Sequence, residues 1–304
     1  MSTSFNTVFN DMKTSLGLAW KSMLSYFLAG LGMIIVFLVL IVLIAAPIAA
    51  VAYLALAPLS EATLIALRDW AATNPLALGA IALLVLIPVV SLFMVVSGSI
   101  YGMSHDLVTT GETKAESAFS YFRRKFLTYA GAGAILTIIV IIPPVIAWGL
   151  TSYAYGFATI ASPVFQLLTI STFVWVFITA GLTSMVFPAV SSGKGVQEAV
   201  KESYSLATRY FDRVYGLQSA ILLLLVISFG PMIVWGITQA PFIPPYLMTF
   251  GPVLAALTLW TVVSAFLWLF LFLPMVRIAW VKVYQELTGG PVATLSVVND
   301  VPIV

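Results

Sequence analysis

The chain has 304 residues, of which 62% are hydrophobic and only 8% are charged. A soluble domain carries roughly 25% charged residues, so this composition leaves too little polar surface to cover a water-soluble globule. The net charge of +2 gives no reason to expect a nucleic-acid partner. The absence of cysteine and the single histidine exclude thiolate chemistry and a histidine-based metal cluster. The composition therefore indicates an integral membrane protein.

Six long apolar stretches follow one another along the chain. Each exceeds the ~20 residues that a helix needs to cross ~30 Å of hydrocarbon. Backbone polar groups inside lipid must pair internally, so we predict an all-α, polytopic membrane protein with six transmembrane helices. The first stretch is the longest and should tilt, extend beyond the bilayer or bend near Pro47. The predicted spans are Tyr26–Leu56, Leu76–Met103, Leu127–Leu150, Pro163–Val190, Leu217–Ile237 and Pro252–Val281.

The cations are distributed very unevenly between the two sides of these spans. All but one of the 13 Lys and Arg residues lie on one side, and only Arg68 lies in an opposite loop. Positively charged connections stay in the cytoplasm. We therefore predict a multi-pass protein of the cell (plasma) membrane, with residues 1–304 forming one membrane domain and both termini cytoplasmic.

The connections on the predicted cytoplasmic side have the pattern of amphipathic helices. Apolar residues recur at steps of three and four in residues 5–24 and 196–215, and over a shorter stretch in 115–126. Lys, Arg and Glu occupy the opposite faces, which is typical of helices lying in the membrane interface. On the outer side, the Pro-rich segment 239–246 cannot form a helix and is predicted to make an ordered cap with Tyr246.

The order interfacial helix, span, outer loop, span occurs three times and predicts three helical-hairpin units. The second and third units share a Pro-x-x-x-Trp-Gly pattern that begins at Pro144 and Pro231, and the first unit lacks it. The predicted units cover approximately 5–103, 115–190 and 196–286, and a short tail covers 287–304.

Ionisable groups inside the spans would indicate ion coupling or a proton relay. The predicted span interiors contain none, and Arg277, at the cytoplasmic end of the sixth span, can extend to the interface. Proton-driven transport is therefore disfavoured. Sodium coupling through carbonyl oxygens at a broken helix stays open, and Pro143, Pro144 and Pro231 are the candidate helix breaks. A simple kink at these prolines is the alternative.

His105, Asp106, Glu112 and Glu116 form a compact group of titratable residues. A His-Asp pair could act as acid or base, and Asp106 with Glu112 could hold a metal ion. However, neighbouring residues point in different directions on a helix, and no nucleophile motif accompanies them. We interpret the group as a solvated helix end, and we expect no enzyme activity, no catalytic or metal-binding residues and no cofactor.

Cations beside aromatic residues at the interface suit anionic lipid headgroups, each contributing about 1 kcal/mol. Ordinary topology determination explains such a basic run equally well. The candidate lipid or partner contacts are Arg123, Arg124, Lys125, Arg209 and Arg213.

Two predicted elbows, ETKAESAFSYFRRKF and VQEAVKESYSLATRYF, each lead into a span, and the closing stretch PMVRIAWVKVYQELTGG contains Pro274, Tyr284 and Glu286. In these stretches the chain resembles a broad prokaryotic group, including archaeal proteins, of six-helix integral membrane domains of unknown function. That group is related to the membrane domain of glycerophosphodiester phosphodiesterases. The resemblance implies a six-helix membrane domain. The catalytic phosphodiesterase domain found beside some relatives has no counterpart here, so its activity is not carried over.

These observations favour a non-enzymatic membrane protein that organises membrane lipids, or docks a cytoplasmic or membrane protein partner, through cytoplasmic interfacial helices. The alternative is a permease, or the membrane subunit of an ATP-driven transport system whose inner elbows contact a separate ATPase. An interfacial hydrolase using His105 and Asp106 is a third hypothesis.

Overall fold

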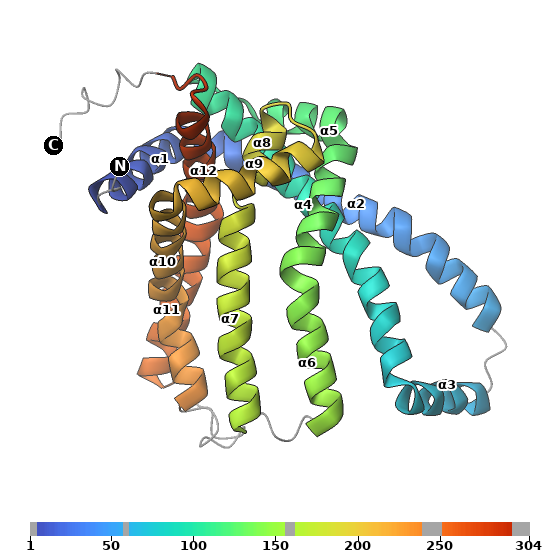
Figure 1. Ribbon diagram of the computed structural model, residues 1–304. Helices are drawn as coiled ribbons and strands as arrows, with labels where there is room; N and C mark the ends of the chain where they lie inside the picture. Colours follow the sequence, from blue (N-terminus) through green and yellow to red (C-terminus); the bar gives the residue numbers. More distant parts are fainter. Residues whose placement is uncertain (1–4, 57–60, 156–161, 239–250, 294–304) are drawn as a thin grey trace.

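The computed structural model describes residues 5–56, 61–155, 162–238 and 251–293, and every element in these parts is helical (Figure 1). Six stretches in them are long and apolar enough to cross a membrane, as predicted, which indicates a multi-pass membrane protein. These candidate spans are Met23–Pro47, Pro75–Thr110, Ala115–Tyr155, Pro163–Ser191, Phe211–Gly236 and Pro252–Thr288.

The described residues of the first half of the chain form six α-helices and one π-helix, several of which run directly into one another. They are α1 (Phe5–Lys21), α2 (Met23–Leu56), α3 (Glu61–Thr73), α4 (Pro75–Thr110), α5 (Ala115–Leu136), the π-helix η1 (Thr137–Ile141) and α6 (Ile142–Tyr155). Helix α3 joins the two first spans and is a helix that the sequence analysis did not predict. Helix α2 continues through Pro47 and lies obliquely to the other spans (Figure 1).

The second half of the chain has the same character. Its elements are α7 (Pro163–Thr183), α8 (Val186–Ser191), α9 (Val196–Arg209), α10 (Phe211–Thr238), α11 (Pro252–Leu267), the π-helix η5 (Trp268–Phe272) and α12 (Leu273–Thr288). The predicted Pro-rich cap at 239–246, with Tyr246, lies outside the described residues.

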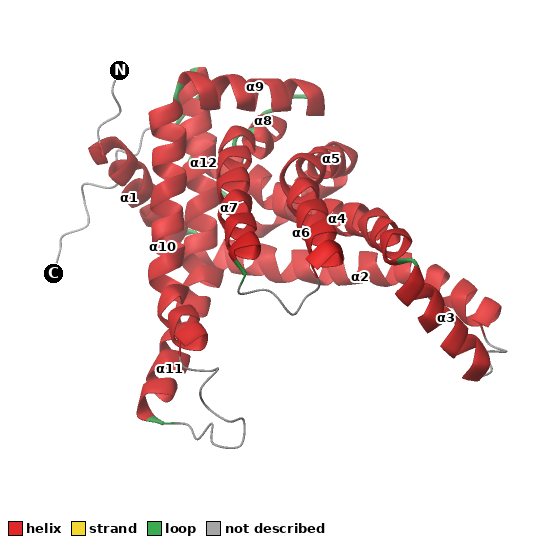
Figure 2. Cartoon of the chain, turned by 60° about the horizontal axis from the view of Figure 1, so that its bottom comes forward, coloured by secondary structure: helices red, strands yellow, loops and turns green. Residues whose placement is uncertain are grey.

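One end of the molecule forms a head, which consists of α1, the first part of α5, α8, α9 and the last turns of α4 and α12. In both overall views α9 lies across the end of α7, and α1 packs beside α12 (Figures 1 and 2). The six residues of α8 are all buried at the centre of the head. The large aromatic side chains of this core are Tyr129, Phe187, Tyr215, Trp280 and Tyr284. Away from the head the helices separate, and α2, α3 and α4 diverge from the rest (Figure 1).

Backbone breaks mark the places where the predicted elbows meet the spans. Ser22 separates α1 from α2, and Lys125 kinks α5 with a φ of −121° and a ψ of 18°. Tyr210, with a φ of −118° and a ψ of 43°, separates α9 from α10. The third elbow helix is therefore shorter than the predicted range 196–215, because its backbone leaves the helical region at Tyr210. The interfacial position of the elbows and their pairing into three hairpin units stay predictions.

The candidate helix breaks do not divide the spans into separate helices. The chain widens into η1 immediately before Pro143 and Pro144, and α10 continues through Pro231 to Thr238. A π-helical turn is a known way of accommodating a disrupted hydrogen-bond ladder. The chain is thus locally widened at the proline pair and continuous at Pro231.

Helices α4 and α5 pack closely because α4 presents two glycines four residues apart. A Cβ atom at Gly98 would overlap the ring of Tyr129, and one at Gly102 would overlap the ring of Tyr121. The glycines therefore seat the two tyrosine rings directly on the α4 backbone.

We expect Gly98→Ala and Gly102→Ala to lower the melting temperature of the purified protein, because each added methyl group must displace a packed ring at a cost of about 1–3 kcal/mol. Gly149→Ala is the matched control, since no atom lies within 4 Å of a Cβ built there. Equal melting temperatures for the three variants would show that α4 and α5 are not packed in this way.

Candidate functional site

Four charged side chains from three distant parts of the chain form one ion-pair network in the head. Asp11 of α1, whose side chain is 3% exposed, is at its centre. Arg213 of α10 donates to it in a fork, with Nε 3.1 Å from Oδ2 and Nη2 3.1 Å from Oδ1. Lys282 of α12 donates from Nζ to Asp11 Oδ1 at 2.7 Å. Glu286, one turn further along α12, pairs with both Arg213 and Lys282.

This network balances two carboxylates, the buried Asp11 and the more exposed Glu286, with two cations, and it joins α1, α10 and α12. Two-pronged Arg–carboxylate contacts are among the stronger and more directional hydrogen bonds in proteins. The amphipathic analysis of residues 5–24 did not single out Asp11, although a signal was present. Asp11 lies three residues after Val8 and seven before Leu18, and so belongs to the buried stripe of α1.

A second polar network connects the α8–α9 segment to α12. Lys194 Nζ lies 2.8 Å from Glu202 Oε2, and the Tyr284 hydroxyl donates to the same oxygen at 3.1 Å. Gln285 Nε2 donates to Ser192 Oγ at 3.1 Å. The hydrogen bond to Glu202 raises the pKa of Lys194 above its usual range, although slight desolvation opposes the shift. These hydrogen bonds therefore join the end of α12 both to α9, through Glu202, and to the residue that follows α8, Ser192.

The basic run at the α5 kink is divided between the surface and the interior. Arg123 and Arg124 are exposed, and the Arg124 guanidinium lies 5.6 Å from the centre of the Tyr121 ring. Lys125 instead turns inward, where its Nζ donates to the carbonyl oxygens of Val190 at 2.5 Å and Ser191 at 3.1 Å. These carbonyls end α8, and a cation is favourable at a helix C-terminus.

The two remaining candidate cations differ in the same way. Arg209 is exposed and lies 5.4 Å from the centre of the Tyr210 ring. Arg213 is engaged by Asp11 and Glu286 in the ion-pair network. The structure therefore leaves Arg123, Arg124 and Arg209 on the outer surface of the head, whereas Lys125 and Arg213 bind its parts together.

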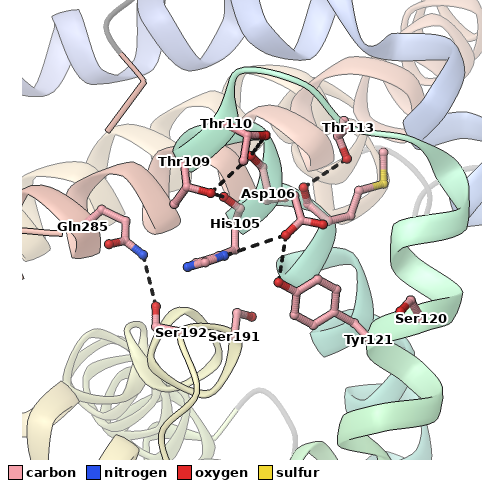
Figure 3. A network of polar contacts seen from close by, with 12 residues as sticks. His105, Asp106, Thr109, Thr110, Thr113, Ser120, Tyr121, Ser191, Ser192 and Gln285 are labelled. Atoms are coloured by element: carbon pink, nitrogen blue, oxygen red, sulfur yellow. Dashed lines mark hydrogen bonds and ion pairs between the residues drawn. The ribbon is translucent and has the colours of Figure 1, made fainter. Parts of the chain in front are cut away.

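The His105 group lies where α4 meets α5 (Figure 3). The Tyr121 hydroxyl donates to Asp106 Oδ1 at 2.8 Å. His105 Nδ1 is 3.9 Å from the same oxygen, which is too far for a hydrogen bond. The two neighbouring side chains nevertheless lie on the same side of α4 (Figure 3). Glu112 and Glu116 are exposed. In the described parts of the chain no three His, Asp or Glu side chains come together as metal ligands would.

Figure 3 shows His105 directed toward Ser191 and Ser192 at the end of α8. The Ser191 hydroxyl is 2.9 Å from the Phe187 carbonyl oxygen, and the Ser192 hydroxyl is 3.0 Å from that of Pro188. Both hydroxyls thus donate to carbonyls one turn earlier, Ser192 Oγ also accepts from Gln285, and Ser191 Oγ also lies 3.1 Å from the Tyr129 hydroxyl. An activated serine is instead hydrogen-bonded to its base, so the geometry gives no support to the hydrolase hypothesis.

An open cavity of about 360 Å³ lies among the helices beside the head. Met94, Ser97 and Tyr101 of α4 line one side, and Phe187 of α8 and Trp280 of α12 line its head end. The rest of the lining is Leu136, Val140, Ile141, Ala180, Thr183, Ser184, Gln218 and Ile221. This cavity could not be predicted from the sequence, because its lining carries no Asp, Glu, His, Lys or Arg and is drawn from six helices and η1.

No family model, curated protein or solved structure matches this chain. The resemblance to the membrane domain of glycerophosphodiester phosphodiesterases therefore stays a prediction.

We expect Asp11→Asn to lower the free energy of unfolding by about 3–5 kcal/mol, because it leaves Arg213 and Lys282 with a single carboxylate in a buried site. Adding Lys282→Met restores the charge balance of the network and should recover part of this loss. Glu198→Gln, at a side chain that is 65% exposed, is the control and should change stability little. The prediction is wrong if Asp11→Asn has the same free energy of unfolding as the wild type. It is also wrong if Lys282→Met lowers the stability of the Asp11→Asn protein by as much as it lowers that of the wild type.

Proposed function

We propose that the chain is a non-enzymatic plasma-membrane protein with both termini in the cytoplasm, and that its head lies at the inner surface of the bilayer and gathers anionic lipids. In this proposal α1, α9 and the first part of α5 are the interfacial elbows. The observation that carries it is the division of the cations, because the head neutralises some of them internally and presents the others outward.

The side chains exposed on the head have the character of a membrane interface. Trp20 of α1 is 65% exposed, and Phe9, Tyr204 and Phe211 are also exposed. Aromatic residues concentrate where hydrocarbon meets the headgroups, and exposed cations attract the anionic lipids of the inner leaflet. The cations exposed on the head are Lys13, Lys21, Lys114, Arg123, Arg124, Lys201 and Arg209.

The internal networks support a role for the head as a fixed platform. Asp11, Lys125 and Glu202 each tie one element to another, so the outward cations are displayed on helices that are held in place. Fixed placement lowers the entropy that is lost when a ligand binds. The same platform would serve a cytoplasmic or membrane protein partner, which is the other form of this proposal.

The permease alternative is favoured by one observation, the cavity of about 360 Å³ among the spans, which lies within the size range of ligand sites. Under this alternative the head would contact a separate ATPase or gate the cavity. Solute flux into protein-containing liposomes distinguishes the two functions.

For the lipid proposal, we expect spin-labelled phosphatidylglycerol to be immobilised by the reconstituted protein more than spin-labelled phosphatidylcholine. Replacing Arg123, Arg124 and Arg209 together by glutamine should remove most of this preference, since each cation near the surface contributes about 1 kcal/mol. Arg68→Gln removes an exposed cation from α3, at the other end of the molecule, and should leave the preference unchanged. An unchanged preference in the triple variant would contradict the lipid proposal and leave partner docking.

A further inference from the structure

We propose that the open cavity is a binding site for one anionic phospholipid from the leaflet that faces the head, with an acyl chain in the cavity and the phosphate at Arg277. This site is distinct from the outward-facing cations of the head and does not depend on their lipid preference.

The shape and lining of the cavity suit a hydrocarbon chain. It follows α4 from Met94 to Tyr101, which is about 10 Å along a helix. Apolar atoms make up most of its surface, and the hydroxyls of Thr183 and Ser184 are bonded to carbonyls of their own helix. Gln218 adds one polar point to the lining, because its buried Oε1 accepts no hydrogen bond from the described residues. A cavity of this kind, open and placed among lipid-facing helices, favours an apolar occupant over a hydrated one.

Arg277 supplies a charge at the head end of this cavity. It lies one turn before Trp280 on α12, and residues three apart share a helix face. It also lies within electrostatic range of Tyr101, which is the lining residue of α4 nearest the head. Arg277 is not itself a lining residue, but it lies near two lining residues, Trp280 on its own helix and Tyr101 of α4.

Arg277 has no protein anion to balance it. Its side chain is partly buried, and it forms no ion pair or side-chain hydrogen bond with any residue in the described part of the chain. An arginine stays protonated in proteins, and a charge removed from water requires a partner. Of the other cations of the head interior, Arg213 and Lys282 pair with Asp11, and Lys125 donates to two carbonyl oxygens of α8.

In this proposal the position of Arg277 along α12 sets the depth of the lipid phosphate. Arg277 precedes Lys282 by five residues and so lies about 7.5 Å deeper along α12 than the contact with α1. This position is the boundary between the head and the spans. The hydroxyl of Tyr26, which bonds to Ser104 at 2.8 Å, lies within electrostatic range of the same guanidinium and is a further polar group at this level. A guanidinium group can bind two oxygens of one phosphate through two parallel N–H···O hydrogen bonds.

The test is native mass spectrometry of the whole protein reconstituted in vesicles of equal parts phosphatidylglycerol and phosphatidylcholine, after detergent has removed loosely bound lipid. We expect wild-type protein to retain one phosphatidylglycerol. Arg277→Gln should reduce this retention about tenfold or more, and Ala180→Phe, which fills the cavity, should do the same. Arg68→Gln, on α3 at the other end of the molecule, is the matched control and should retain the lipid. A millimolar excess of inorganic phosphate should not displace it.

Undiminished retention in Arg277→Gln, equal retention of the two lipids by wild type, or displacement by inorganic phosphate would each overturn the proposal, the last in favour of a free-phosphate site. If a variant fails to fold, wild-type protein decides the question. Phosphatidylglycerol with a photoreactive acyl chain should then cross-link to residues 94–101 and 180–187, and cross-links confined to other lipid-exposed surfaces would contradict the site.

Discussion

The carboxylate of Asp11 is the constraint on which the arrangement of the head depends. It is almost completely buried, and it holds Arg213 and Lys282, which lie far away in the sequence, against the first helix of the chain. A buried ion pair adds little net stability over a well-packed apolar core, but it penalises every arrangement in which its charges are separated. The network therefore specifies how α1, α10 and α12 meet, more than it adds to the stability of the bundle.

The head and the spans differ in how their side chains are satisfied. Within the head, several polar groups from different helices bond to one another, as in the contacts of Lys125 with α8 and of Tyr284 with Glu202. Away from the head, large apolar side chains such as Leu38 and Leu223 stay exposed and need lipid around them. The proposed function and the proposed lipid site both follow from this division, because the exposed cations of the head and Arg277 have no carboxylate partner in the described part of the chain.

Sequence reasoning found the parts of the fold that depend on hydropathy alone. The number and positions of the spans follow from uninterrupted apolar runs, and the backbone breaks at Lys125 and Tyr210 lie near the predicted junctions of elbow and span. It could not find the partners of charged residues, since Asp11 and Lys282 are 271 positions apart. The five candidate cations look alike in the sequence, and only the packing of α8 and α1 shows which of them turn inward. The cavity could not be predicted either, because its lining residues come from distant parts of the sequence.

The most direct test of this account measures the position of α1 relative to α9 in the membrane. Because the natural chain has no cysteine, spin labels can be attached at Gly17→Cys and Lys201→Cys, two exposed positions, and their separation measured by pulsed electron resonance in lipid discs. A head fixed through Asp11 predicts one narrow distance distribution, which broadens when Asp11 is replaced by asparagine. A broad distribution in the otherwise wild-type protein, or one unchanged by the Asp11 substitution, would contradict the claim that this carboxylate holds the head together.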